Sequence, residues 1–288
     1  MRFQFLRARP STSSFLKCLL VGALFALAKD AAAQAHGHLY IGATATTNGA
    51  PLTFDNGPDF TTASGYVKTL VFTNGGRFSN YFHGNITLTG LSRTPGHPEF
   101  SENAAALGAY LHAGIVAVEG PAGGEFGFWE NGSTAPTISF RSGDTSTNLF
   151  RVSEGDGSAG SDPYGHIHGR RFTATKAGLY RITFKAWDLS ANRPNGGPIH
   201  TASNVLPVYF QAGTVITSIN RTGTTARVTF GSEVNRSYVL EFTDNIASNS
   251  WEQIGAAVIG NDYFQQLIDP AADDATRFYR VRGEAVTP

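Results

Sequence analysis

Short runs of alternating apolar and polar residues, each ended by glycine, asparagine, aspartate or proline, recur along most of this 288-residue sequence. Stretches with a helical spacing of apolar residues are scarce. Successive side chains of a β-strand point to opposite faces, so this alternation is typical of antiparallel sheets that bury one face. The sequence therefore predicts an all-β protein, with one helical turn expected in the alanine-rich stretch 102–111.

The strand pattern predicts two modules. In the first, expected at 36–213, the clearest strands are 66–72, 115–118, 179–187 and 205–210. A second series of strands begins near Thr214, at the spacing expected of a small sandwich. Its expected strands are 215–219, 226–230, 238–242, 251–254, 264–268 and 278–281. Gly178-Leu179-Tyr180 resembles the tyrosine corner of immunoglobulin-like sandwiches. We expect two antiparallel β-sandwich modules of this type, 36–213 and 214–288.

The start of the chain has the features of a cleavable signal peptide. Four basic side chains in the first 17 residues precede the apolar run 18–28. That run is too short to cross a hydrocarbon core of ~30 Å as a helix. Ala33-Gln34-Ala35 fits the small-x-small cleavage pattern, which predicts a signal peptide at 1–35 and a mature chain that begins at His36. Cleavage after Ala33 is the alternative. The expected location is the periplasm, the cell surface or the medium.

Net charge and cysteine content narrow the range of possible functions further. The chain has 22 basic and 22 acidic residues, and 1–35 contains five of the bases and one of the acids. The mature net charge is therefore about −4, whereas a nucleic-acid binder needs a basic stripe. The only cysteine, Cys18, leaves with the signal peptide, so no disulfide is expected. We also expect no transmembrane segment in the mature chain.

The histidines are the residues that most clearly point to chemistry. All eight lie between residues 36 and 200, and two pairs, His36/His38 and His166/His168, have the spacing His-x-His. On an extended strand, residues i and i+2 share a face at ~6.6–6.8 Å, so both imidazoles of a pair can reach one zinc ion. The alternative is that the imidazoles are exposed or bonded to backbone carbonyls. The presence of two such pairs and of His200 strengthens the metal-binding interpretation, but the metal-binding and the structural interpretations both stay open.

A site built only from neutral imidazoles does not offset the charge of a dication, so a carboxylate is expected nearby. Asp188 and Asp162 are the nearest acids considered. Asp188 is interpreted as a turn residue at the end of a strand, and Asp162 is expected to be exposed in a Gly/Ser-rich stretch. Neither is predicted as a ligand.

Sequence signatures of catalysis are not found. The chain has no G-x-S-x-G, no H-E-x-x-H and no glycine-rich phosphate loop, and the mature chain has no thiol nucleophile. This predicts a protein without enzymatic activity.

Three segments carry a resemblance to a known family: GHIHGRRF (165–172), TKAGLY (175–180) and GPIHT (197–201). They resemble the secreted bacterial proteins controlled by the zinc-uptake repressor. A related pattern, Gly-His-x-His followed by Phe-Thr and Gly-x-Tyr, marks surface-anchored proteins encoded near metal-uptake transporters. The resemblance covers most of 36–212. It implies zinc handling outside the cytoplasm, with His38, His166, His168 and His200 on the histidine motifs.

The resemblance also implies partners, namely the metal ion and a metal-uptake transporter or cell-surface component. The family's C-terminal sorting anchor is not found here. In its place, the second module resembles an immunoglobulin-like appendage of exported bacterial proteins, which implies a stalk or attachment role.

Three functions stay open from the sequence. The leading one is an exported, non-enzymatic zinc-binding protein that gathers or buffers metal through His38, His166, His168, His200 and His36. The second is a copper site that uses the free amine and imidazole of His36, since imidazole suits both ions and copper(II) binds more tightly. The third is a structural or adhesive β protein whose histidines are incidental.

Overall fold

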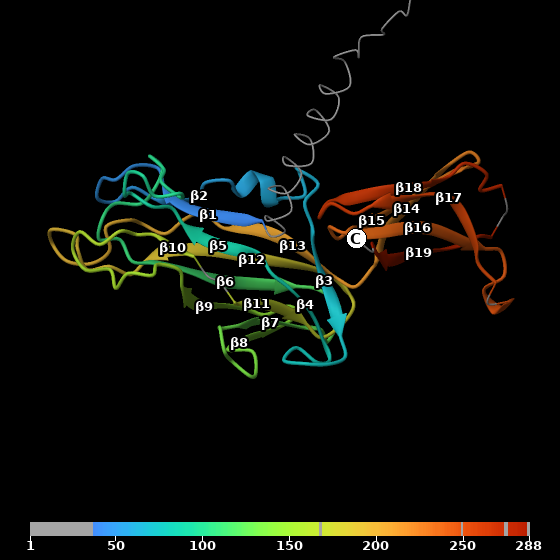
Figure 1. Cartoon of the computed structure of the whole chain (residues 1–288), viewed down its shortest axis with the longest axis horizontal. Helices are drawn as coiled ribbons and strands as arrows, with labels where there is room; N and C mark the ends of the chain where they lie inside the picture. Colours follow the sequence, from blue (N-terminus) through green and yellow to red (C-terminus); the bar gives the residue numbers. More distant parts are fainter. Residues whose placement is uncertain (1–36, 167–168, 249, 274–275, 287–288) are drawn as a thin grey trace, which may run out of the picture. The chain divides into compact units, whose positions relative to one another are not determined.

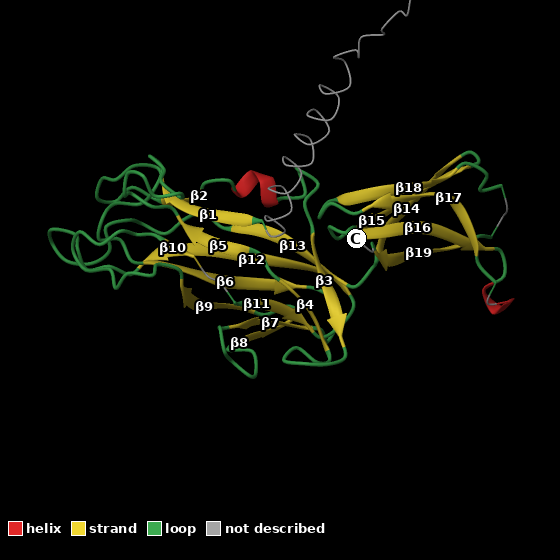
Figure 2. Cartoon of the chain, viewed as in Figure 1, coloured by secondary structure: helices red, strands yellow, loops and turns green. Residues whose placement is uncertain are grey.

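The computed structural model describes residues 37–166, 169–248, 250–273 and 276–286. Its regular structure is almost entirely strand, and the helices among these residues are the short 3-10 turns η2 (Gly57–Phe60) and η3 (Ile246–Ser248) (Figure 2). The predicted all-β class is confirmed. None of the helices in the described part of the chain is long and apolar enough to cross a membrane. The predicted signal peptide, 1–35, lies outside the described residues.

The first module contains two sheets (Figure 1). The smaller has the order β10-β5-β1-β2 and consists of β1 (His38–Ala43), β2 (Leu52–Phe54), β5 (Thr87–Gly90) and β10 (Gly165–His166). The larger has the order β8-β7-β11-β4-β3-β13-β12-β6-β9 and consists of β3 (Lys68–Thr73), β4 (Tyr81–Gly84), β6 (Leu111–Glu119), β7 (Glu125–Trp129), β8 (Ile138–Arg141), β9 (Thr145–Arg151), β11 (Arg171–Ala174), β12 (Gly178–Asp188) and β13 (Leu206–Ala212). Most neighbours are antiparallel, but β1 pairs with β5 and β13 with β3 in parallel.

One apolar core lies between these sheets. Leu39 on β1 and Leu88 on β5 are fully buried in the same cluster as the aromatic residues of the larger sheet. Phe128 on β7 and Phe150 on β9 stack with ring centroids 4.1 Å apart, although their strands are far apart in the sheet order. The larger sheet therefore curls over its own core. The small sheet buries one face there, which leaves its other face for polar side chains.

The tyrosine corner expected from the sequence is present as a local structure. Tyr180 is fully buried, and its hydroxyl donates a hydrogen bond of 3.0 Å to the carbonyl of Lys176, four residues upstream. A Cβ on Gly120 or Gly124 would come within 2.5 Å of the Tyr180 side chain. Those two glycines therefore make room for the corner.

The helical turn expected at 102–111 was wrong, because 102–110 form a loop with turns and Leu111 begins β6. Some of its backbone amides bond to distant segments, and the local bonds, such as that from the amide of Ala109 to the carbonyl of Ala106 at 3.0 Å, close single turns only. The amide of Ala106 donates to His200 Nε2 at 2.9 Å, and the amide of Gly108 donates to the carbonyl of Ser161 at 2.7 Å. Gly108 also has φ +86°, a left-handed conformation that ends a right-handed helix. The loop uses alanines because they fit under the neighbouring segments: Ala105 is fully buried.

The second module contains two three-stranded sheets, of order β14-β15-β18 and β17-β16-β19. Their strands are β14 (Ile216–Thr222), β15 (Thr225–Gly231), β16 (Arg236–Thr243), β17 (Glu252–Ile259), β18 (Phe264–Asp269) and β19 (Phe278–Ala285), which match the six predicted strands. The module has its own core, formed by Val228, Phe230, Tyr238, Leu240 and Leu267. The division of the chain into independent modules at 213/214 stays a prediction.

Several hydrogen bonds cross the predicted boundary. The side-chain amide of buried Gln211 accepts from the amide of Gly231 at 2.9 Å and donates to the same residue's carbonyl at 3.1 Å. Lys68 forms an ion pair of 2.9 Å with Asp262, and both side chains are largely buried. Residues from His38 onward accordingly group as one compact unit.

Candidate metal site

The outer face of the small sheet carries the site. Alternation along β1 buries Leu39 and Ile41 and leaves His38 and Tyr40 half-buried on the opposite face. The central strand β5 pairs with β1 on one side and β10 on the other, with His38 opposite Thr87 and His166 opposite Thr89. Paired residues point to the same side of a sheet, and so do residues i and i+2. His38 and His166 therefore flank β5 on one face.

Local backbone packing explains why glycines occur where the two histidines approach. Gly165, directly before His166, pairs with Gly90 on β5. A Cβ on Gly165 would overlap the carbonyl oxygen of Val152, and one on Gly90 would come within 2.8 Å of the carbonyl oxygen of Pro163. The Gly-His sequence thus lets β10 approach its neighbours closely and brings His166 to the sheet face.

The two imidazoles lie close together and share an acidic neighbour. Their ring centroids are 4.7 Å apart in an edge-on arrangement at 77°. One potential ligand atom each from His38, Glu99 and His166 lies within 4.8 Å of the other two, and all three residues are partly exposed. Tetrahedral zinc bonds of ~2.0–2.2 Å place neighbouring ligand atoms about 3.4 Å apart. The ligand atoms of this His–Glu–His cluster thus lie within 4.8 Å of one another, and a tetrahedral ion would need them somewhat closer.

Glu99 reaches the cluster from the loop between β5 and β6, and sequence reasoning missed it. The loop folds back so that Ser92 pairs with Phe100. Within it, the amide of Ser92 donates to the carbonyl of Glu99 at 2.9 Å. The amide of Glu99 in turn donates to His97 Nδ1 at 3.0 Å. The charge argument did predict a carboxylate beside the histidines. No spacing rule could select Glu99, because it is distant in sequence from both histidines.

Further groups surround the three potential ligands. His38 Nδ1 lies 3.2 Å from the hydroxyl of fully buried Thr89, so an ion held at Nε2 would leave this contact intact. Such outer partners orient the ring and select its tautomer. Burial raises the pKa of the Tyr40 phenol, and the charge of Glu99 and a hydrogen bond to its carboxylate raise it further. The Tyr40 phenol therefore lies close to the Glu99 carboxylate.

A pocket adjoins His166, one residue of the cluster. The pocket has a volume of about 360 Å³, with Glu130, Asn131, Arg151, Val152, Ser153, Glu154, His166 and Arg170 as its lining. Most of these side chains are polar, and Arg170 is held by an ion pair of 2.5 Å with Glu130. Charged and polar side chains therefore lie next to His166 in this pocket.

The structure places the other predicted ligands elsewhere or does not describe them. His36 and His168 lie outside the described residues. His200 is 1% exposed, and it is not part of the His–Glu–His cluster. Its Nδ1 donates to the carbonyl of Ala50 at 3.1 Å, and its Nε2 accepts from the amide of Ala106 at 2.9 Å. The His200 ring thus connects the segment at Ala50 with the loop at Ala106 through one hydrogen bond at each nitrogen.

His200 should make the protein less stable in mild acid. Burial lowers its pKa below the ordinary value, so the unfolded chain binds a proton more readily than the folded one. Stability is therefore present above the unfolded pKa of ~6.5 and is lost as the pH falls toward the lower folded value. In metal-free protein, His200→Gln should lose less stability between pH 7 and pH 5 than the wild type, as measured by urea unfolding. Burial also lowers the pKa of His83 and His112, but these two histidines are present in both proteins and contribute equally to both. An equal loss of stability in wild type and variant would therefore contradict this role of His200.

Asp188 and Asp162, the two acids considered in the sequence, both accept hydrogen bonds from backbone amides. Asp188 is 4% exposed at the end of β12 and accepts from the amides of Tyr110, Ser190 and His200 at 2.9–3.0 Å. Burial alone would raise the pKa of Asp188, but these hydrogen bonds outweigh it and the net pKa is lowered. Asp162 was expected to be exposed; it is partly buried and accepts four hydrogen bonds.

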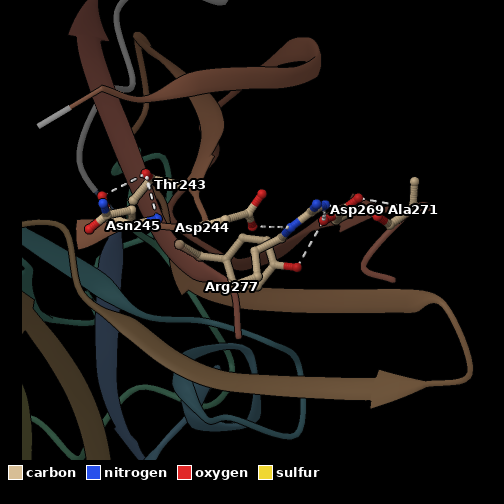
Figure 3. Close-up of polar contacts among 7 residues, drawn as sticks. Thr243, Asp244, Asn245, Asp269, Ala271 and Arg277 are labelled. Carbon is tan, nitrogen blue, oxygen red and sulfur yellow. Dashed lines mark hydrogen bonds and ion pairs between the residues drawn. The ribbon is translucent and has the colours of Figure 1, made fainter. Parts of the chain in front are cut away.

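Two acids of the second module, Asp244 and Asp269, form ion pairs with Arg277 (Figure 3). Arg277 bonds Asp244 at 3.0 Å and Asp269 at 2.9 Å, and it donates to the carbonyl of Ala271 at 2.8 Å. Its guanidinium lies 4.1 Å from the ring centroid of Phe242. These contacts tie the ends of β16, β18 and β19 together and serve stability.

The His–Glu–His cluster offers two imidazole nitrogens and one carboxylate oxygen to an ion. Three protein ligands of this kind leave a fourth position for water, which is the arrangement of zinc sites that stay open. Neither a protein-family model nor a curated protein gives a significant match to this sequence.

Proposed function

We propose that this chain is an exported, non-enzymatic zinc-binding protein that gathers or buffers the metal outside the cytoplasm. The observation that supports it most is the His–Glu–His cluster, in which residues from β1, β10 and a loop meet on one sheet face. This cluster places two imidazoles edge-on with a carboxylate beside them. Export rests on the signal-peptide pattern of 1–35.

The donor set favours a borderline transition metal. Imidazole nitrogen binds zinc well, whereas calcium and magnesium prefer oxygen ligands. The single carboxylate offsets part of the charge of the dication. Because the three residues are partly exposed and a polar pocket adjoins His166, bound metal can exchange with solvent. Exchange suits acquisition or buffering better than a closed structural site does.

Glu99 provides the direct test of this function. Protein purified without a histidine tag and dialysed against buffered zinc should retain one zinc per chain, and Glu99→Gln should retain much less, because the amide keeps the shape and loses the charge. Glu102→Gln is the matched control: Glu102 lies on the same loop, its side chain is 80% exposed, and it is not part of the cluster. A wild-type protein that retains no zinc, or a Glu99→Gln variant that retains as much as wild type, would refute the assignment.

A further inference from the structure

Asp162 connects the two pieces of chain that carry Glu99 and His166. It lies four residues before His166, and its amide-bonding partner Tyr164 lies between them in the segment that leads into β10. Its other partners, Ser92, Arg93 and Thr94, belong to the loop that carries Glu99. A single carboxylate thus joins both segments.

The Asp162 carboxylate accepts four hydrogen bonds. Oδ1 accepts from the amides of Tyr164 at 2.9 Å and Arg93 at 3.3 Å. Oδ2 accepts from the hydroxyl of Ser92 at 2.9 Å and from that of Thr94. Hydrogen bonds to an ionised acceptor are among the stronger ones in proteins. The carboxylate is therefore a firm link between the loop and the start of β10.

Ser92, a hydrogen-bond partner of Asp162, is also bonded to Glu99. The amide of Ser92, whose hydroxyl bonds Asp162, donates to the carbonyl of Glu99 at 2.9 Å, and the amide of Ser101 donates back to the carbonyl of Ser92 at 3.1 Å. Glu99 is thus held on the backbone that Asp162 secures. We propose that Asp162 is a positioning residue of the metal site, which fixes the distance between the Glu99 carboxylate and the His166 imidazole. This inference rests on the proposed zinc site, since it assigns Asp162 a role in that site.

A cycle of variants tests the inference. Zinc affinity is measured by competition with a chromophoric chelator for wild type, Asp162→Ala, Glu99→Ala and the double variant. Partners of a ligand typically contribute 10–100-fold to metal affinity, so Asp162→Ala should weaken binding about tenfold. In the Glu99→Ala background, which keeps both histidines, it should change affinity less than about twofold, because contributions that act through one group are not additive.

Asp188 gives the matched control. It also accepts several hydrogen bonds from backbone amides, but it holds the segments at Tyr110 and His200. Asp188→Ala should lower stability and leave zinc affinity unchanged. An Asp162→Ala effect of equal size with and without Glu99, or no effect in a wild-type protein that binds zinc, would overturn the positioning role.

A metal-free measurement separates this inference from the zinc function. In apo protein, Asp162→Asn and Asp162→Ala should speed amide hydrogen exchange at Ser92 and Ser101, while amides of β15 and β16 keep their protection. Unchanged exchange at Ser92 and Ser101 would overturn the link itself. Wild-type protein that binds no zinc would refute the proposed function, and the exchange data would still decide whether Asp162 holds the loop.

Discussion

Replacing both His38 and His166 with alanine should weaken zinc binding by more than about 100-fold, since even partners one shell beyond a ligand contribute 10–100-fold. Each single variant should already lose most of the affinity. The combined loss should be smaller than the two single effects multiplied, because ligands of one ion act as a unit. Competition titrations of the two single variants and the double variant measure this directly.

Zinc should also stabilise the wild type and not the double variant. Native-state binding at ~100-fold excess over Kd adds ~2.7 kcal/mol, which corresponds to about 5–10 °C in the melting temperature of a module of this size. The gain belongs to the first module, because the second contains no histidine. Equal stabilisation of both modules would contradict the location of the site.

His200 supplies the matched control for the ligand variants. It is buried and bonded through both ring nitrogens, so His200→Ala should lower stability and keep the zinc affinity. If His200→Ala weakened zinc binding as much as His166→Ala does, the prediction from the sequence that His200 is a ligand would be correct and the zinc-bound arrangement would differ from the one described.

The largest effect on folding is expected from Phe172→Ala. Phe172 on β11 is fully buried, and its ring centroid lies 5.3–5.9 Å from those of Phe126, Phe128, Phe184 and Phe210. Removing such a ring leaves a cavity and typically costs about 3–5 kcal/mol. Calorimetry should show the transition of the first module shifted to lower temperature.

Phe230→Ala is the counterpart in the second module, where Phe230 is fully buried 5.0 Å from the ring of Tyr238. If 36–213 and 214–288 fold independently, each substitution should shift only the transition of its own module. A single transition shifted equally by both variants would show that the modules unfold together, and the contacts of Gln211 and Lys68 across the boundary would explain why.

Much of the fold could be predicted because strand structure depends on local pattern. Each predicted strand of the second module is present, and the buried face of β12 follows the alternation read from the sequence. The loop at 102–111 could not be predicted in this way. Its alanines favour a helix locally, but Ala106 bonds His200 and Gly108 bonds Ser161, and both partners lie far away in the chain.

The sequence by itself placed all eight histidines between residues 36 and 200, with two pairs at His-x-His spacing, and predicted that a carboxylate is needed beside them. Only the tertiary structure decided that β5 separates His38 from His166, that a folded-back loop brings Glu99 to them, and that His200 bonds to the backbone instead. The reason is physical: alternation fixes the direction of a side chain within one strand, whereas the neighbours of that strand depend on loop closure and on the packing of the whole core.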